Sequence, residues 1–357
     1  MLSLEQRIKA FEILGRFISQ TKDARADEDL QKLNRHFLKE YHTCIQDAAL
    51  FNHWFTPENL DFALGEWSNA LNPDQLQAWL IDYDSDYFDH DREQKTVAII
   101  MAGNIPLVGF HDLLSVLISG HKALIKPSSD DAKLIPFICQ MLVAINPEFA
   151  KQMAFAEGQM KNFDAVIATG SDNSARYFES YFGKYPHIIR KNRSSVAVLS
   201  GEESVEDLEL LGEDIFRFFG LGCRNVSKVY VPQDFKIQRL FEAFYKFKYV
   251  GDHNKYGNNY DYNRAIYLME HHDFLENGFF IIKENEALHA PVSVLHYERY
   301  TDVATLKANL NQLESEIQCL VSKMETFDTA VALGESQKPR LWDYADNVDT
   351  LEFLRKL

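Results

Sequence analysis

The sequence predicts an α/β protein with two lobes, each a mostly parallel sheet flanked by helices, and a helical N-terminal region. Three observations support this class. The chain has 357 residues, of which 46% are apolar, and a single hydrophobic core stops growing beyond roughly 250–300 residues. Short β-branched apolar runs alternate with helix-length segments from residue 96 onward, which is typical of doubly wound parallel sheets. Residues 1–92 contain no such runs.

The N-terminal region begins with an amphipathic pattern. Leu4, Ile8, Phe11, Leu14 and Ile18 recur at helical spacing, and charged residues precede any apolar stretch. This predicts a helix and not a secretory signal peptide. The rest of this region, to residue 92, is expected to be helical and polar.

The first lobe follows as strand and helix in alternation. The run TVAIIMA fills a buried strand, GNIP breaks the chain, LVGFHDLLSVLIS supplies a helix, and KALIKP is the next strand, so the segment forms a βαβ unit. The elements expected after it are a helix near 130–145, a strand at 163–170, a helix at 171–182, and strands at 187–191 and 194–200.

A second series of elements follows from Val196 onward, and we place the boundary between lobes close to Arg193. Its expected elements are a helix at 202–219, the turn GLGCRN, a strand at 227–232, a helix at 235–247, and apolar runs near 265–269 and 279–282. The stretch DHNKYGNNYDYN, residues 252–263, is rich in Asn, Tyr and Gly. We interpret it as a loop between elements.

The net charge, the cysteine spacing and the absence of several binding motifs exclude some classes of function. The formal net charge of −16 disfavours nucleic acid and anionic membrane surfaces as partners. No apolar run approaches the roughly 18 residues of a membrane-spanning helix. The four cysteines are widely separated and form no CxxC pair, so we expect a reducing cytoplasm and no structural zinc. The sequence contains no GxGxxG, GxxxxGK[ST] or HExxH motif, and no metal site is predicted.

Two segments of the first lobe carry polar residues at expected strand ends. Asn104 lies in the loop after one strand, where its amide could face an oxyanion, and the next strand ends in Lys126-Pro127-Ser128, where a lysine could hold a ribose or phosphate. Thr169-Gly170-Ser171 enters a helix whose free N–H groups favour phosphate. The alternatives are a turn residue, a solvated strand end and an ordinary helix N-cap.

The third segment carries Cys223. It follows Gly220 and Gly222 at a turn between a helix and a strand, and Arg224 is beside it. Glycines allow close approach of a substrate to the backbone, and a neighbouring cation lowers the pKa of a thiol. An inert thiol is the alternative on this feature alone. The other three cysteines lie on helical patterns and are interpreted as inert.

In order, the motifs GNIP, SGHKALIKPS, ATGS and GLGCRNVSKVYVP resemble the aldehyde dehydrogenase superfamily. The closing segment QKPRLWDYADNVDTLEFL resembles that of its LuxC-type acyl-CoA reductase branch. The resemblance implies an aldehyde-dehydrogenase-like fold with a dinucleotide-binding lobe in residues 1–193 that includes the helical region. It implies a catalytic thiol lobe in 194–330 and a C-terminal segment, 331–357, that packs back near the active site.

The resemblance also implies reduction of an acyl-CoA, such as a fatty acyl-CoA, to an aldehyde with a nicotinamide cofactor. Cys223 would be the nucleophile and Asn104 the oxyanion-hole amide. The residues implied for cofactor binding are Lys126, Ser128, Ser129, Thr169, Gly170 and Ser171. A noncatalytic acyl- or nucleotide-binding relative, an acyltransferase and a semialdehyde-forming reductase remain alternatives on the same fold.

Two positions depart from the superfamily pattern, and a third bears on cofactor choice. The stretch IIRKNRSSVAVLS has no carboxylate where hydrolytic members carry a water-activating Glu. The contact to the nicotinamide ribose would fall on Ala287 or the adjacent Glu286 and is left unassigned. Ser129 stands where NAD-preferring members place a Glu, which favours NADPH, with NADH as the alternative. A homodimer is left open.

Overall fold

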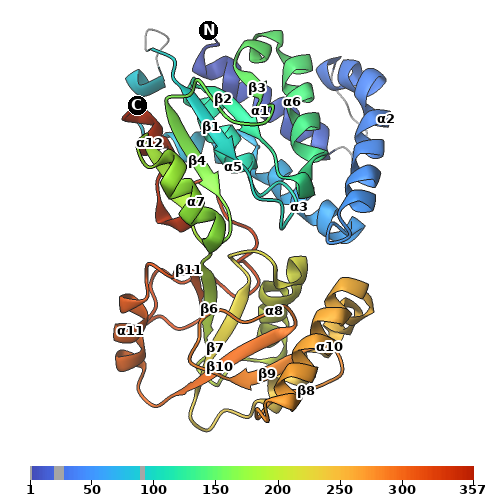
Figure 1. The fold of residues 1–357 in the computed structure, drawn as a ribbon, viewed down its shortest axis with the longest axis vertical. Coiled ribbons are helices and arrows are strands. Elements are labelled where there is room, and N and C mark those ends of the chain that lie inside the picture. Colours follow the sequence, from blue (N-terminus) through green and yellow to red (C-terminus); the bar gives the residue numbers. More distant parts are fainter. Residues whose placement is uncertain (1, 20–27, 89–92) are drawn as a thin grey trace. The chain divides into compact units, whose positions relative to one another are not determined.

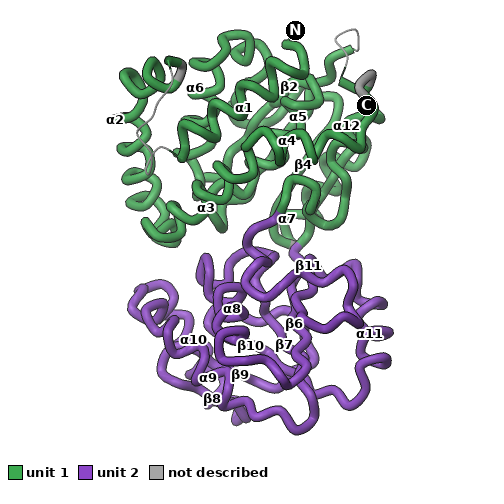
Figure 2. Tube along the Cα trace, turned by 180° about the vertical axis from the view of Figure 1, so that it is seen from behind, with its two compact units in different colours: residues 1–191, 340–357 green, residues 192–339 purple. Residues whose placement is uncertain are grey.

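The computed structural model describes residues 2–19, 28–88 and 93–357. The chain divides into two compact units (Figure 2). Unit 1 contains Met1–Lys191 and Arg340–Leu357, and unit 2 contains Asn192–Pro339. Parts of the predicted helical region 1–92, namely 1, 20–27 and 89–92, lie outside the described residues.

Helices dominate the described part of the N-terminal region. Their starts follow local chemistry, because Ser3 forms a capping box with Gln6, and Thr56 and Asn72 each cap a helix that begins with proline. The elements are α1 (Leu4–Ile18), α2 (Glu28–Phe51), α3 (Pro57–Ala70), α4 (Pro73–Leu80) and the 3₁₀ turn η2 (Ser85–Phe88).

Unit 1 contains a five-stranded sheet in the order β3-β2-β1-β4-β5, and every pair is parallel. Ala98, Val166 and Ala168 face α7, whereas Val97 and Ile99 face the core shared with α1, α5 and α6. Helices therefore cover both faces (Figure 1). The strands are β1 (Thr96–Ile100), β2 (Lys122–Lys126), β3 (Met153–Phe155), β4 (Ala165–Thr169) and β5 (His187–Arg190). The helices are α5 (Phe110–Ile118), α6 (Leu134–Ile145) and α7 (Asp172–Phe182), with 3₁₀ turns η3 (Ser129–Asp131) and η4 (Pro147–Lys151).

Unit 2 contains a six-stranded sheet in the order β11-β6-β7-β10-β9-β8. All its pairs are parallel except the antiparallel edge pair of β8 and β9. The strands are β6 (Ser194–Val198), β7 (Val226–Pro232), β8 (Leu275–Glu276), β9 (Ile281–Glu284), β10 (Val294–Tyr300) and β11 (Ile317–Val321). The helices are α8 (Val205–Phe216), α9 (Gln238–Phe244), α10 (Asn254–Met269) and α11 (Val303–Gln312), with 3₁₀ turns η5 (Arg217–Gly220) and η6 (Tyr245–Asp252).

The two sheets confirm the predicted fold class of mostly parallel sheets flanked by helices. The prediction of a loop at residues 252–263 was wrong, because most of that stretch lies in α10. Tyr256, Tyr260, Asn263 and Tyr267 are its buried residues, and their spacing of four, three and four is helical. The Asn, Tyr and Gly content that indicated a loop therefore includes tyrosines that form a buried aromatic face of a helix.

After unit 2 the chain returns to unit 1 and ends in η7 (Ala345–Asn347) and α12 (Thr350–Arg355). This return supplies hydrogen-bond partners to side chains at the start of α5 and the end of β5. Arg190 forms a buried ion pair with Asp112 at 2.5 Å and donates a hydrogen bond to the Thr350 hydroxyl at 3.2 Å. The Leu341 carbonyl lies 2.8 Å from His111 Nε2. The expected C-terminal segment, 331–357, is therefore divided between the units, because residues 331–339 belong to unit 2.

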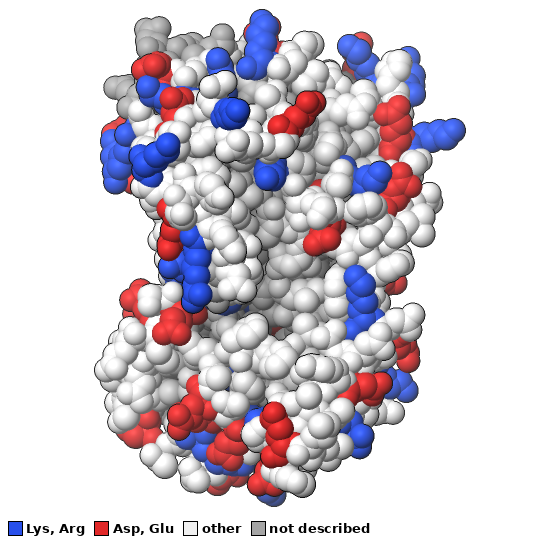
Figure 3. All heavy atoms as spheres, viewed as in Figure 1, with Lys and Arg blue, Asp and Glu red and all other residues white. Residues whose placement is uncertain are grey.

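No helix in the described residues is long and apolar enough to span a membrane. On the face drawn in Figure 3, acidic and basic side chains are interspersed.

Candidate active site

The carboxyl ends of three neighbouring strands in unit 1 lie level with one another. Ile100 at the end of β1 pairs with Lys126 on one side and with Ala168 on the other. The exposed Lys126 side chain, the loop that carries the exposed Asn104, and Thr169 therefore all stand at the same edge of the sheet. In a parallel sheet whose order reverses at β1, this edge is where ligands bind.

The loops after β1 and β2 touch each other. A Cβ added at Gly103 would lie 2.7 Å from the Ser128 hydroxyl oxygen, so only glycine fits there. The buried Asn52, at the end of α2, donates hydrogen bonds to the carbonyls of Gly103 and Asp130 at 3.4 and 3.2 Å. Sequence reasoning missed Asn52, because no local pattern signals a contact across 51 residues.

Asp131 holds the loop after β1 through a buried hydrogen bond. Its carboxylate is buried and accepts a hydrogen bond from the Leu107 N–H at 2.9 Å. Leu107 has a φ of 60°, a conformation that costs a leucine free energy and needs such support. Burial raises the pKa of Asp131 to about 6, against the lowering effect of its backbone hydrogen bonds. Asp130 is exposed, and so is Ser129.

The predicted phosphate segment leads into α7. Thr169 ends β4, Gly170 follows, and Ser171 is the N-cap, whose hydroxyl accepts a hydrogen bond from the Ser174 N–H at 3.4 Å. Ser128 plays a similar part at η3, where its hydroxyl accepts from the Asp130 N–H at 3.1 Å. Both serines therefore serve as caps, and the alternative of an ordinary N-cap holds for the geometry of Ser171.

Cys223 lies in unit 2, on the turn between α8 and β7, and is exposed. Phe218, Phe219 and Gly220 before it have φ values of 53°, 58° and 75°. A left-handed backbone conformation costs free energy at the two phenylalanines, and burial of both rings offsets that cost. The thiol is therefore presented from a turn whose shape is set by its buried neighbours.

Asn225 fixes this turn from the inside. Its buried amide nitrogen donates to three carbonyls at the end of α8, those of Asp214, Ile215 and Arg217, at 3.0, 3.3 and 2.8 Å. Its amide oxygen accepts from the Gly222 N–H at 2.8 Å. One side chain thus caps the helix and holds the residue before Cys223.

Two further contacts reach the turn. The Ser195 hydroxyl on β6 donates to the Cys223 carbonyl at 2.9 Å, and it also lies 3.1 Å from Cys319 Sγ. Arg224 Nε donates to the Ser336 carbonyl at 2.6 Å. Arg224, the cation expected beside the thiol, is thus also bound through its Nε to the segment that follows β11.

The remaining thiols differ in exposure from Cys223. Cys139 is buried in α6, and Cys44 is half-buried. Burial raises the pKa of each of these two thiols to about 12, which leaves them protonated and unreactive near neutral pH. The structure agrees with the inert interpretation of both.

The loop that carries Glu286 and Ala287 is held by two buried side chains. Lys228 on β7 donates to the Glu286 carbonyl and to the Glu298 carboxylate, each at 2.6 Å. His296 Nδ1 on β10 lies 3.0 Å from the Ala287 carbonyl, and burial lowers its pKa. The side chains of Glu286 and Ala287 are exposed. No sequence motif pointed to Lys228 or His296, which lie on otherwise ordinary strands.

The structure thus gathers the predicted cofactor residues and Asn104 in unit 1 and places Cys223 in unit 2. Among the described residues, no group of three or more His, Cys, Asp or Glu side chains is arranged to hold a metal ion.

Comparison with known proteins adds an independent finding. A family model described as Acyl-CoA reductase (LuxC) matches residues 6–242, a range that contains Asn104, Lys126 and Cys223. A curated relative, the long-chain acyl-protein thioester reductase of Aliivibrio fischeri, is 20% identical over 215 residues, which are 55% of this chain and 41% of the relative. The alignment thus spans less than half of that protein.

Solved aldehyde dehydrogenase structures have a similar fold. Aldehyde dehydrogenase 21 from Physcomitrella patens aligns with a TM-score of 0.65 and 13% identity, over 100% of this chain and 84% of the other. Aldehyde dehydrogenase C from Pseudomonas syringae aligns with a TM-score of 0.63 and 11% identity, over 92% and 74%. The fold is therefore aldehyde-dehydrogenase-like, as the sequence motifs implied, and the chain belongs to the acyl-CoA reductase (LuxC) family.

Proposed function

We propose that the chain reduces an acyl-CoA, with NADPH as reductant, to an aldehyde through a thioester on Cys223. The observation that carries this proposal is the exposed Cys223 thiol on a turn held by Asn225 and Ser195. A turn fixed in this way keeps a nucleophile in place for attack on a carbonyl carbon.

The acylation step follows from residues of the chain itself. The Cys223 sulfur attacks the thioester carbonyl, and CoA leaves as its thiol. The developing oxyanion would be stabilised by the Asn104 amide and the Cys223 backbone N–H. The segment IIRKNRSSVAVLS offers no carboxylate to activate water, so the acyl-enzyme is expected to persist until it is reduced. Bound NADPH would supply the hydride for that reduction.

The edge of the unit 1 sheet fits a dinucleotide. The strand order reverses between β1 and β4. The cation Lys126 stands at the carboxyl end of β2, and the carboxyl end of β4 leads into the N-terminus of α7. A cation and free backbone N–H groups are the donors that ribose and pyrophosphate need. Lys126, Ser128, Ser129, Thr169, Gly170 and Ser171 would hold the cofactor. The exposed Ser129 offers a hydroxyl in place of a repelling carboxylate, which favours the 2′-phosphate of NADPH.

The segment after β11 supports part of the predicted organisation. The Ser336 carbonyl accepts a hydrogen bond from Arg224, the neighbour of Cys223. The Ser336 N–H donates to the Asp214 carboxylate on α8 at 2.9 Å. This supports the proposal that the C-terminal segment, from residue 331, packs near the active site.

The four cysteines are all free thiols, which agrees with a reducing compartment such as the cytoplasm.

Intact-protein mass spectrometry after mixing with an acyl-CoA, without a nicotinamide, tests the function directly. We expect an adduct equal to the acyl group that Cys223→Ala does not form and that Cys139→Ala still forms. Addition of NADPH should then remove the adduct and release aldehyde. If the Cys223→Ala protein forms the same adduct, or if no acyl-CoA gives one, the chain is a binding relative and not a reductase.

A further inference from the structure

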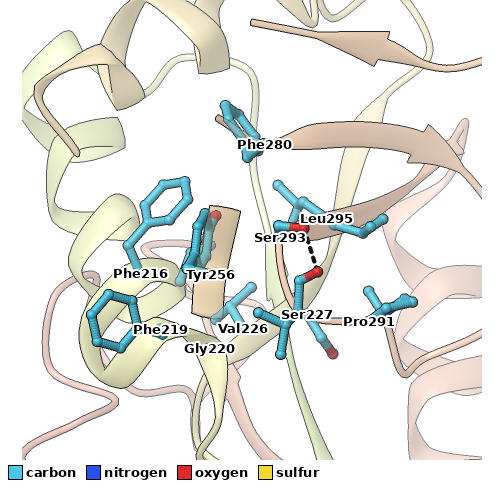
Figure 4. Close-up of a pocket in the computed structure, with 14 residues that line it drawn as sticks. Phe216, Phe219, Gly220, Val226, Ser227, Tyr256, Phe280, Pro291, Ser293 and Leu295 are labelled. Atoms are coloured by element: carbon cyan, nitrogen blue, oxygen red, sulfur yellow. Dashed lines mark hydrogen bonds between the residues drawn. The ribbon is translucent and has the colours of Figure 1, made fainter. Parts of the chain in front are cut away.

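Unit 2 contains a small aromatic pocket beside the Cys223 turn (Figure 4). Its cavity volume is about 30 Å³. Phe216, Phe219, Tyr256 and Phe280 supply aromatic walls, and Pro291 and Leu295 lie on another side. A pocket of this size accepts only a few non-hydrogen atoms.

The Tyr256 hydroxyl is the unusual group in this pocket. Tyr256 is 1% exposed, and its oxygen has no hydrogen-bond partner. In Figure 4 it lies on the side of the ring toward Phe280 and Ser293. A buried hydroxyl without a partner is unfavourable, and native proteins rarely keep one without a reason. Burial also raises the pKa of Tyr256, so this phenol stays protonated and can donate a hydrogen bond.

The other side-chain hydroxyls that line the pocket already have partners. Ser227 donates to the Leu288 carbonyl at 2.8 Å, and Ser293 donates to the Val292 carbonyl. Among the lining residues, all of which the structure describes, Tyr256 alone has a buried side-chain polar atom without a partner. The pocket therefore combines apolar walls with one buried side-chain hydroxyl that has no partner.

The pocket lies within reach of an acyl group on Cys223. Gly220 and Val226, which both line it, are each three residues from Cys223 along the chain. Three residues span at most about 11 Å even when fully extended. Phe219, on this turn, packs against Tyr256 on α10, and the centroids of the two rings are 6.0 Å apart. The turn that presents the thiol is thus itself part of the pocket wall.

We propose that this pocket receives the far end of a short acyl group that bears a hydroxyl or carbonyl oxygen, which hydrogen-bonds to the Tyr256 hydroxyl. The inference rests on the proposed reductase function and names its substrate class. The apolar walls take the methylene groups, and the Tyr256 hydroxyl distinguishes an oxygenated chain from a plain one of equal length, because only the former satisfies it.

Two thioesters of equal heavy-atom count make the test sharp, 4-hydroxybutanoyl-CoA and pentanoyl-CoA. They differ only in a hydroxyl that replaces a methyl group. We expect kcat/KM for the hydroxylated thioester to exceed that for pentanoyl-CoA by about 10-fold or more, and to exceed that for dodecanoyl-CoA as well. In Tyr256→Phe, the preference over pentanoyl-CoA should fall to about 1.

Tyr260→Phe is the matched control, one turn further along α10. The Tyr260 hydroxyl donates to the Glu276 carboxylate at 2.6 Å, so its removal should lower the melting temperature and leave the acyl preference intact. Tyr256→Phe should not lower the melting temperature, because the hydroxyl it removes has no partner. A loss of stability in Tyr256→Phe as large as in Tyr260→Phe would reveal a permanent partner, such as a bound water, and would overturn the inference.

The kinetic outcomes separate this inference from the function on which it rests. Efficient reduction of pentanoyl-CoA or dodecanoyl-CoA with no preference for the hydroxylated chain, unchanged in Tyr256→Phe, would overturn the inference and leave the reductase in place. Absence of a Cys223 adduct with all three thioesters would contradict the reductase function, and the inference would fail with it.

Discussion

The amide oxygen of Asn225 accepts a hydrogen bond from the Gly222 N–H at 2.8 Å, within the turn that leads from α8 into β7. The same side chain donates to three helix-end carbonyls. Helix capping and placement of the residue next to Cys223 are therefore coupled through one buried amide.

Replacement of Asn225 should uncouple these two tasks. Asn225→Ala removes both sets of hydrogen bonds and leaves buried carbonyls unpaired, so we expect a loss of about 3 kcal/mol in the free energy of unfolding. Asn225→Asp keeps the acceptor for Gly222 and loses the donors. Urea denaturation and the rate of Cys223 acylation measure the two effects. Equal acylation rates in both variants would show that Gly222 is held in some other way.

Loss of the Asn104 amide should slow turnover rather than weaken binding. Removal of one oxyanion-hole donor typically lowers kcat by about 10²–10³, and we expect this for Asn104→Ala with the best acyl-CoA. Steady-state kinetics and the rate of CoA release check it. A raised KM with an unchanged kcat would remove Asn104 from the oxyanion hole.

The buried Asp131 predicts a specific dependence of stability on pH. Its folded-state pKa of about 6 lies above the ordinary value of 3.8, so the folded protein holds this proton more tightly than the unfolded chain. The free energy of unfolding therefore falls as the pH rises from about 4 to 6, by up to about 3 kcal/mol from this group.

Asp131→Asn removes the titration while keeping an acceptor for the Leu107 N–H. The stability of the variant relative to the native protein should therefore rise between pH 4 and 7, and the other carboxylates cancel in this difference. Urea denaturation across that range provides the measurement. A difference independent of pH would mean that Asp131 titrates near its ordinary value.

Cofactor choice should respond to position 129. The exposed Ser129 follows Lys126 by three residues, and Ser129→Glu would place a carboxylate near the expected 2′-phosphate. We expect kcat/KM with NADPH to fall by about 10-fold or more, with a smaller change for NADH, because like charges repel. Asp130→Asn is the control and should alter neither. A native preference for NADH would show that Ser129 does not face the adenosine ribose.

Local sequence patterns were sufficient for much of the fold. The β1–α5–β2 unit was predictable because buried parallel strands are short apolar runs and the intervening helix is apolar along its length. The strand β3 was not predicted, since three half-exposed residues at a sheet edge carry little pattern. The helix α10 was missed because its buried face is tyrosine rather than aliphatic.

The candidate site divides in a similar way. Roles for Cys223, Asn104 and Lys126 could be predicted because the motifs that carry them resemble those of the aldehyde dehydrogenase superfamily, whereas their local patterns alone left an inert thiol, a turn residue and a solvated strand end as alternatives. The side chains that hold those turns, Asn52 and Asn225, form contacts that depend on how distant or buried segments pack. Their roles emerge only from the folded chain, and so does the lack of a partner for the Tyr256 hydroxyl.

The return of residues 340–357 makes unit 1 a discontinuous domain, with all of unit 2 inserted between its two pieces. A nascent chain could complete unit 2 on the ribosome, whereas unit 1 must wait for its last segment. Until then Arg190 lacks its bond to Thr350, and the Trp79 indole lacks the Tyr344 hydroxyl that it donates to at 2.7 Å. Chains released before this segment is made should therefore carry a complete unit 2 and an incomplete unit 1, in which the ends of α4 and β5 still lack these partners.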